Sequence, residues 1–385
     1  MLLVEHIIEE ARKRDASDIH FLFGLKPILR ISRKLTELED VDPLEENDLY
    51  EIYEYIIQGN VEKDQEYKEN RRLDTSLVYK DLRLRVNCSF SDDMPVFTMR
   101  LIKNELPPYE SLGVPDIVRR MTYLPQGLML ITGKTNSGKS TTLSSLVDHI
   151  NQTQNRKILC LESPIEYKHT SKKSIIVQKE VGPGKDVLEY RIGVMNALRE
   201  DCDVLVIGEI RDKKTMEAAI DMAESGHLVI GTLHTKSCAE TVDRMLNFYE
   251  VHDQAQIKNL LSGLLKLVIS QRLLRSADGT KLVLVPEVMV VDNTVSACIR
   301  KEKFSLSEIE DAIQSNLEKG SVGLMNSLAK LYVQGDLDLD TCKMQLEEKN
   351  YETFSRIISQ TKLKMGNDSS SDDDLGEGFT MEEDK

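Results

Sequence analysis

Apolar residues recur along the first hundred positions with two different periods. The stretches Ile28–Ile31 and Leu82–Val86 alternate between apolar and polar side chains, as half-buried strands do. Around Leu49–Ile57 the apolar residues recur with the period of a helix. The N-terminal stretch MLLVEHIIEEARKRDASD has acidic residues within its apolar pattern, which favours an amphipathic helix over a signal peptide. We therefore predict a small α/β domain over residues 1–102.

Beyond residue 115 the pattern changes to continuous apolar runs separated by helical segments. This alternation predicts a parallel sheet with helical crossovers over residues 116–290. The candidate strands are Leu128–Thr132, Lys157–Leu161, Asp203–Ile207, Leu228–Gly231 and Leu282–Val290. Pro286 lies inside the last of these and cannot donate a backbone hydrogen bond, so that strand is expected at an edge or broken. The turn-rich residues 103–115 form the expected linker between the domains.

The C-terminal part divides into two segments. Residues 291–363 are mainly helical in pattern. Residues 364–385 are rich in Ser, Asp, Glu and Gly, and we predict a disordered acidic tail because so few apolar side chains cannot form a core. From residue 367 onward, eight acidic residues and one lysine give a charge of −7, nearly half of the −15 of the whole chain.

Composition narrows the class of protein. A chain of 385 residues with 40% hydrophobic and 30% charged residues is typical of a two-domain soluble α/β protein. The longest apolar run, Leu260–Ser270, is interrupted by Lys266, so no membrane-spanning helix is predicted. The six cysteines include no CxxC pair, which favours a reducing compartment and disfavours a tetrahedral zinc site. The acidic balance disfavours nucleic acid as a direct ligand, because phosphate contacts need clustered Lys and Arg.

The sequence GKTNSGKS at residues 133–140 has the spacing of a phosphate-binding loop. An apolar strand precedes it and a helix, Thr141–Ile150, follows, so the positive end of the helix dipole adds to the site. The predicted nucleotide-binding residues are Gly133, Lys134, Thr135, Asn136, Ser137, Gly138, Lys139, Ser140 and Thr141. Lys139 is expected to contact the β and γ phosphates, and the Ser140 hydroxyl to bind Mg²⁺. We therefore predict a nucleoside triphosphate ligand.

Acidic residues follow the next two strands along the chain. Glu162 and Glu166 lie in LESPIEY, and Glu209 follows the buried strand that ends in Gly208. Because the carboxyl ends of strands face the ligand in open α/β sheets, these carboxylates are candidates for holding Mg²⁺ and polarising water.

Two histidines bracket the strand in GHLVIGTLH. His227 and His234 lie seven residues apart, and a histidine at a strand end could sense the γ-phosphate. Spacing alone does not choose between this role and ordinary packed or surface histidines. A metal pair is disfavoured, because no third ligand lies near them in the sequence.

Four motifs in this order carry a resemblance to a known family. GKTNSGKSTTL, LESPIEYKH, LREDCDVLVIGEIRD and GHLVIGTLHT resemble the Walker A, Asp box, Walker B and His box of the type II/IV secretion ATPases. ASDIHF and RLRVN also fit, so the resemblance spans about residues 1–345. It implies a PAS-like N-terminal α/β domain, a RecA-like P-loop ATPase core and a helical C-terminal part.

The resemblance also implies roles for individual residues. Glu166 matches the glutamate that activates water, and Glu209 matches the Walker B acid beside Mg²⁺. His234 matches the His-box residue, with His227 beside it. Arg85 and Arg100 match N-domain arginines that reach the nucleotide across a subunit boundary and act as arginine fingers.

The same resemblance implies an assembly and a location. The family acts as a homo-hexamer whose domains close to transmit force. The expected ligands are ATP and Mg²⁺, and the expected partner is an inner-membrane pilus platform protein of the PilC type. The implied location is cytoplasmic and peripheral, at the inner face of the cytoplasmic membrane.

Within the family, the chain is most similar to the PilT-type ATPases that retract type IV pili. The sequence contains no CxxC zinc module, and its short N-terminal domain resembles that of retraction ATPases more than the extended N-terminal region expected of assembly ATPases. Two motif positions depart from the usual pattern: Ser163 replaces an aspartate, which should still allow hydrolysis, and Lys134 replaces a proline. In residues 294–301, which align with the C-terminal retraction motif, only Ile299 and Arg300 are clearly preserved.

Three alternatives to a retraction motor remain open. The first is a motor for pilus or pseudopilus assembly or for type IV secretion. The second is a ring-shaped nucleic-acid translocase, which the acidic composition disfavours. The third is a scaffold without hydrolytic activity.

Overall fold

The computed structural model describes residues 2–31, 34–80, 82–102 and 106–371. Its described part divides into two compact units. The first contains the chain up to Pro107 together with Val147–Glu209, and the second contains Pro108–Leu146 and the chain from Ile210 onward. Within the described residues, no helix has the length and apolar character needed to cross a bilayer.

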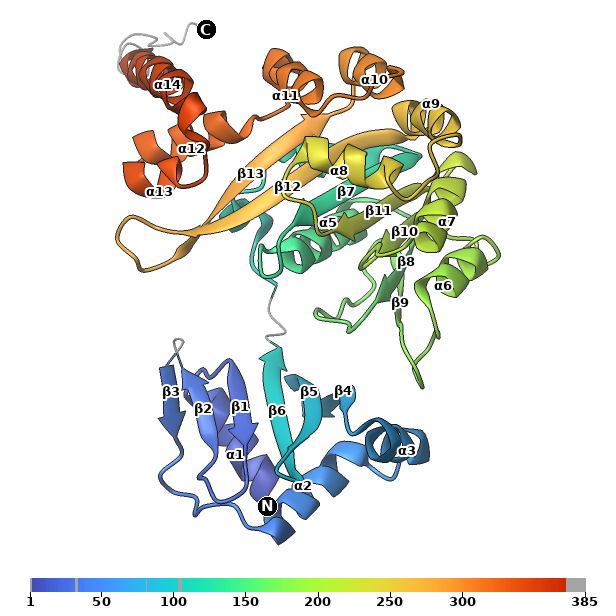
Figure 1. Cartoon of the computed structure of the whole chain (residues 1–385), viewed down its shortest axis with the longest axis vertical. Helices are drawn as coiled ribbons and strands as arrows, with labels where there is room; N and C mark the ends of the chain where they lie inside the picture. The colour runs from blue at the N-terminus through green and yellow to red at the C-terminus, as the bar shows by residue number, and fades with distance from the viewer. Residues whose placement is uncertain (1, 32–33, 81, 103–105, 372–385) are drawn as a thin grey trace, which may run out of the picture. The chain divides into compact units, whose positions relative to one another are not determined.

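The N-terminal residues form an antiparallel six-stranded sheet with the strand order β3-β2-β1-β6-β5-β4 (Figure 1). Its strands are β1 (Asp18–Phe21), β2 (Ile28–Ile31), β3 (Lys34–Glu37), β4 (Leu73–Tyr79), β5 (Leu82–Ser91) and β6 (Met94–Ile102). The helices of this region are α1 (Leu3–Lys13), α2 (Glu46–Ile57) and α3 (Val61–Asn70). The strands and the helix predicted here from periodicity are all present.

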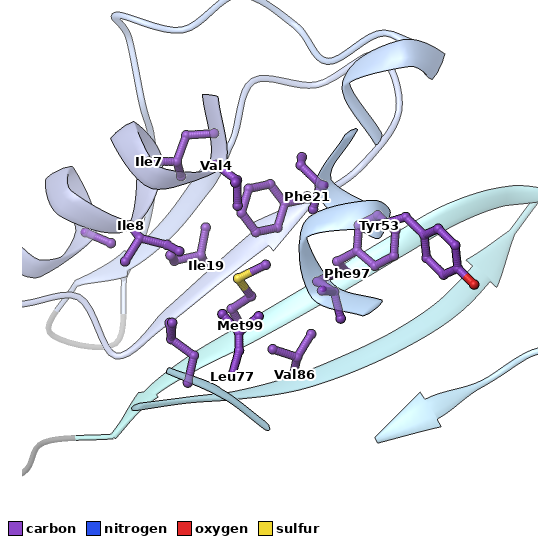
Figure 2. Packing of buried hydrophobic residues seen from close by; sticks show 14 of the residues in the cluster. Val4, Ile7, Ile8, Ile19, Phe21, Tyr53, Leu77, Val86, Phe97 and Met99 are labelled. Carbon is purple, nitrogen blue, oxygen red and sulfur yellow. The ribbon is translucent and has the colours of Figure 1, made fainter. Parts of the chain in front are cut away.

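One face of this sheet packs on helices α1 and α2. Helix α1 buries positions 4, 7, 8 and 11, which is the spacing of a single apolar stripe. Figure 2 shows Ile7 and Ile8 of this helix lying with Phe21, Phe97 and other labelled side chains in one cluster. Each fully buried side chain of this size stabilises the fold by about 1.5–3 kcal/mol. The apolar pattern thus leaves the polar positions of the strands on the opposite face.

The second sheet has seven strands in the order β13-β12-β7-β11-β10-β8-β9 (Figure 1). Its strands are β7 (Gly127–Gly133), β8 (Lys157–Glu162), β9 (Ile175–Glu180), β10 (Val204–Ile207), β11 (Leu228–Leu233), β12 (Leu265–Arg275) and β13 (Leu282–Val290). Every residue of β7, β10 and β11 is buried, as expected for central strands covered on both faces.

Two features of this sheet differ from the sequence-based expectation. Strands β9 and β12 were not among the predicted strands. Strand β12 pairs in parallel with β7 but antiparallel with β13, so the sheet is not purely parallel. Pro286 lies within an unbroken β13 at the sheet edge, where a residue without a backbone N–H is tolerated.

Helices surround the second sheet and form the C-terminal part (Figure 1). They are α4 (Asp116–Arg120), α5 (Lys139–Thr153), α6 (Tyr190–Ala197), α7 (Lys213–Glu224), α8 (Cys238–Leu246), α9 (Gln254–Leu264), α10 (Asn293–Arg300), α11 (Leu306–Ser315), α12 (Leu324–Val333), α13 (Leu339–Lys343) and α14 (Tyr351–Ser371). Short 3-10 turns occur at Tyr109–Leu112, Met121–Tyr123, Leu317–Lys319 and Glu348–Asn350. A small core that includes Leu328, Cys342 and Phe354 joins the last helices to β13.

The tail departs from its prediction at its start. Helix α14 continues to Ser371, whereas disorder was expected from residue 364. Residues 372–385 of the predicted tail lie outside the described residues.

Candidate active site

The loop between β7 and α5 has the backbone of a phosphate cradle. Gly133, Asn136 and Gly138 have positive φ values of 144°, 63° and 89°. A Cβ atom on Gly133 would lie 2.4 Å from the Ser137 Oγ and 2.5 Å from a backbone oxygen, so only glycine fits there. The Ser137 N–H donates to the Lys134 carbonyl at 3.2 Å, which closes a tight turn. This curvature is what turns backbone N–H groups toward an anion.

The positively charged side chain of Lys139 lies against the phosphate loop itself. The Lys139 Nζ donates to the carbonyl oxygens of Gly133 at 2.8 Å and Lys134 at 3.0 Å. Helix α5 begins at Lys139, so Ser140 and Thr141 lie in its first turn, where the positive end of the helix dipole favours phosphate. A triphosphate therefore fits the loop, and the Ser140 hydroxyl is the kind of oxygen ligand that Mg²⁺ accepts.

Strand β12 forms a wall beside the phosphate loop. The Gln271 Nε2 donates to the Thr142 Oγ1 at 2.7 Å, and both side chains are buried. A Cβ on Gly138 would lie 3.6 Å from Leu273. A cavity of about 420 Å³ is lined by Lys134, Thr135, Asn136, Ser137, Lys236, Gln271, Arg272, Leu273, Leu274, Met344 and Gln345. The residues of β12 and positions 344–345 were not predicted from the sequence, because they follow the loop by more than a hundred residues and carry no motif.

The acidic segment after β8 is held by a residue of β9. The Gln178 Nε2 donates to the Glu162 Oε1 at 2.9 Å and to the Tyr167 carbonyl at 2.8 Å. Its Oε1 accepts from the His169 N–H at 2.9 Å. Burial raises the pKa of Glu162 to about 7, and the nearby charge of Glu166 adds to this, while the hydrogen bond from Gln178 opposes it. The half-buried Glu166 thus lies on a connection that Gln178 ties to the sheet.

The second acidic strand end lies next to the first. Strand β10 pairs in parallel with β8, with Ile207 opposite Leu161. The Gly208 N–H donates to the Leu161 carbonyl at 2.8 Å, and a Cβ on Gly208 would lie 3.1 Å from that oxygen. Glycine therefore allows the close approach that brings Glu209 to the same sheet edge as Glu162. No group of three or more His, Cys, Asp and Glu side chains suited to a metal ion occurs within the described ranges.

The structure separates the two histidines. Strand β11 pairs in parallel with β7, with Leu228 opposite Gly127 and Leu233 opposite Thr132. His234 follows the end of β11 that is next to the phosphate loop, and it is exposed. His227 precedes the other end, roughly 20 Å away along the strand. Its Nδ1 lies 2.9 Å from the Ser225 Oγ and 3.1 Å from the Met222 carbonyl, so its side chain does not lie beside His234.

The two arginines expected to act as fingers lie on the polar face of the N-terminal sheet. Arg85 of β5 is directly opposite Arg100 of β6, and both are exposed. The Arg100 Nε donates to the nearly buried Asp18 Oδ1 at 2.8 Å. Burial alone would raise the pKa of Asp18, but hydrogen bonds from Arg100 and Ser17 outweigh it and lower that pKa. The ionised Asp18 therefore holds Arg100 in place.

A phosphate loop between a buried strand and a helix, followed by acidic strand ends, defines a P-loop nucleotide hydrolase with an N-terminal α/β domain. The family model described as Type II/IV secretion system protein matches residues 1–365, and the chain belongs to this family. The family and the enzyme class expected from the sequence, an ATPase, are confirmed.

Two curated relatives and one solved structure are similar to most of the chain. This chain is 34% identical over 322 residues to the type IV pilus retractation ATPase PilT of Pseudomonas aeruginosa, and the match covers 83% of this chain and 90% of that one. It is 35% identical over 289 residues to a twitching motility protein of Neisseria gonorrhoeae, covering 75% and 76%. The crystal structure of the pilus retraction motor PilT with bound ADP has a TM-score of 0.83 at 34% identity, covering 92% of this chain and 100% of that one. The predicted α/β fold class, with a P-loop core and a helical C-terminal part, is confirmed.

Proposed function

We propose that this chain is an ATP-driven motor that retracts type IV pili. The observation that carries the proposal is the phosphate loop, whose glycines at positive φ, Lys139 and α5 N-terminus suit a triphosphate. The chain is similar to pilus retraction and twitching motility proteins over most of their length, which supports a pilus filament as the structure that this motor moves.

In the proposed reaction, the loop binds the ATP phosphates and Lys139 neutralises charge on the γ-phosphoryl group. Ser140 and Glu209 would hold Mg²⁺, which supplies charge neutralisation at the phosphates when it is bound. Glu166 accepts the proton of the attacking water, and His234 contacts the γ-phosphate. Of the residues expected from the sequence, Glu162 and His227 are given no role in this proposal.

The rest of the negative charge on the γ-phosphoryl group is neutralised by arginines of a neighbouring subunit. We propose a homo-hexamer in which Arg85 and Arg100 of one subunit reach the nucleotide of the next. An arginine that enters after closure stabilises the transition state and links hydrolysis to movement. The proposed partner is a platform protein of the inner membrane, which the hexamer contacts from the cytoplasmic side without spanning the bilayer.

Purified full-length chain tests the enzymatic part of this proposal. Lys139→Ala should lower the rate of ATP hydrolysis by at least about a hundredfold, because the γ-phosphoryl charge is no longer neutralised. Phosphate release is the measurement, with the exposed α7 variant Glu224→Gln as the control that should keep the full rate. An unchanged rate in Lys139→Ala would place the activity elsewhere. Stimulation of hydrolysis by single-stranded DNA would favour a translocase instead.

A further inference from the structure

Glu287 is a buried carboxyl group in β13 to which the proposed reaction gives no role. It is 7% exposed. It lies opposite Ser270 of β12, which lies opposite Thr132 of β7, the residue before the first glycine of the phosphate loop. Burying a carboxyl group is costly unless it is well hydrogen-bonded. Its position beside the phosphate-loop strand therefore calls for an explanation.

The carboxyl group contacts the start of helix α8. The Glu287 Oε2 accepts a hydrogen bond from the Cys238 N–H at 3.1 Å, and the Cys238 thiol donates to the Glu287 carbonyl at 3.4 Å. Cys238 is the first residue of α8, whose N-cap Ser237 accepts from the Glu240 N–H at 3.1 Å. Unpaired N–H groups and the helix dipole favour an acceptor at this end. Strand β13 thus fixes the helix that begins four residues after His234.

Two neighbouring strands hold the same connection. The Thr235 and Thr241 hydroxyls lie 2.7 Å apart, the Thr241 hydroxyl donates to the Ser237 carbonyl at 2.8 Å, and its oxygen lies 3.4 Å from the Thr132 Oγ1 of β7. The Arg272 Nη2 of β12 donates to the Lys236 carbonyl at 3.2 Å. Side chains of β7, β12 and β13 therefore each hold one part of the segment 235–241.

We propose that Glu287 is a positioning residue for ATP hydrolysis. Its carboxyl oxygen fixes the first turn of α8, and through that turn it fixes the connection from which His234 acts. The proposal rests on the role of His234 given above. The contact requires a side chain long enough to bring an acceptor oxygen to the Cys238 N–H, because that single backbone group is its partner. Three charged groups interact electrostatically with the Glu287 carboxyl group: Arg272, which favours its ionised form, and Glu240 and Glu310, which disfavour it.

Steady-state ATP hydrolysis by the full-length chain tests this with two complementary variants. Glu287→Asp keeps the acid but shortens the side chain by one methylene, which breaks the contact with Cys238. Glu287→Gln keeps the length and an acceptor oxygen. We expect kcat to fall about tenfold in Glu287→Asp, with KM for ATP unchanged within about twofold, because the phosphate loop is intact. Glu287→Gln and the control Glu224→Gln should keep kcat within about twofold.

His234→Ala is measured in parallel to separate the two proposals. Equal losses in Glu287→Asp and Glu287→Gln, or an increase in KM without a fall in kcat, would overturn the positioning role. An unchanged kcat in Glu287→Asp beside an impaired His234→Ala would overturn the role of Glu287 alone. An unchanged kcat in His234→Ala would overturn the role of His234, and the inference about Glu287 with it. The length-preserving Glu287→Gln is expected to fold, which keeps the comparison informative.

Discussion

Two carboxyl groups, the half-buried Glu162 and the buried Glu287, stand out at the scale of single residues. Burial raises the pKa of each to about 7. The Glu162 carboxyl accepts a hydrogen bond from the Gln178 side chain, and the Glu287 carboxyl accepts one from a helix N-terminus. Both groups therefore combine an unfavourable environment with a specific contact beside segments that we assign to hydrolysis.

The pKa of Glu287 makes stability depend on pH. The folded state keeps the proton that the unfolded chain loses above its ordinary pKa of 4.5, so the free energy of unfolding falls as pH rises from 4.5 to about 7. Glu287→Gln removes this titration. We expect the stability of the variant relative to the unaltered chain to rise by about 2–3 kcal/mol between pH 4.5 and pH 8. Urea unfolding at several pH values measures it, and a constant difference would contradict the burial argument.

Motif residues could be assigned from the sequence because their chemistry depends on local spacing. Gly133 and Gly138 are needed by the turn itself, and Lys139 and Ser140 follow at fixed distances along the chain. Gln271, in contrast, reaches Thr142 across 129 positions of sequence. Such a contact depends on how the strands pair, and one sequence read in order does not reveal it.

At the scale of elements, apolar periodicity predicted the central strands more reliably than the outer ones. Strand β7 is buried along its whole length and reads as a continuous apolar run. Strand β9 is half-buried at the sheet edge and reads IIVQKE, a pattern with too few apolar residues to stand out. Strand β12 carries Lys266, whose polar head interrupts an otherwise apolar run. Partial burial therefore explains why β9 was missed, and the interruption by Lys266 explains why β12 was missed.

The two ends of strand β11 give a direct test of the placement of the histidines. His234→Ala should lower kcat for ATP hydrolysis by about tenfold to a hundredfold, because it follows the strand end beside the phosphate loop. His227→Ala should leave kcat within about twofold, because it lies at the other end of the strand.

Paired kinetic measurements on these two variants, with thermal melting to confirm folding, provide the comparison. Equal losses of activity in both variants would contradict the assignment. The family resemblance paired the two histidines, whereas the structure places them at opposite ends of strand β11.

At the scale of the whole molecule, the sequence predicted the order of the α/β regions but not their grouping. An alternating pattern before residue 102 and continuous apolar runs after residue 116 gave two different sheets, and the structure contains both. The grouping of Val147–Glu209 with the N-terminal residues depends on contacts between distant parts of the chain. No local pattern carries such information, so the predicted domain bounds stay predictions.

The number of surface pili in the source organism tests the central claim most directly. Cells that carry Lys139→Ala in place of the chromosomal copy would be compared with cells that carry Glu224→Gln. A retraction motor without hydrolysis should leave more pili than in the control and abolish twitching motility. Cells without pili would instead indicate an assembly motor, and an unchanged number of pili would contradict a role in pilus dynamics.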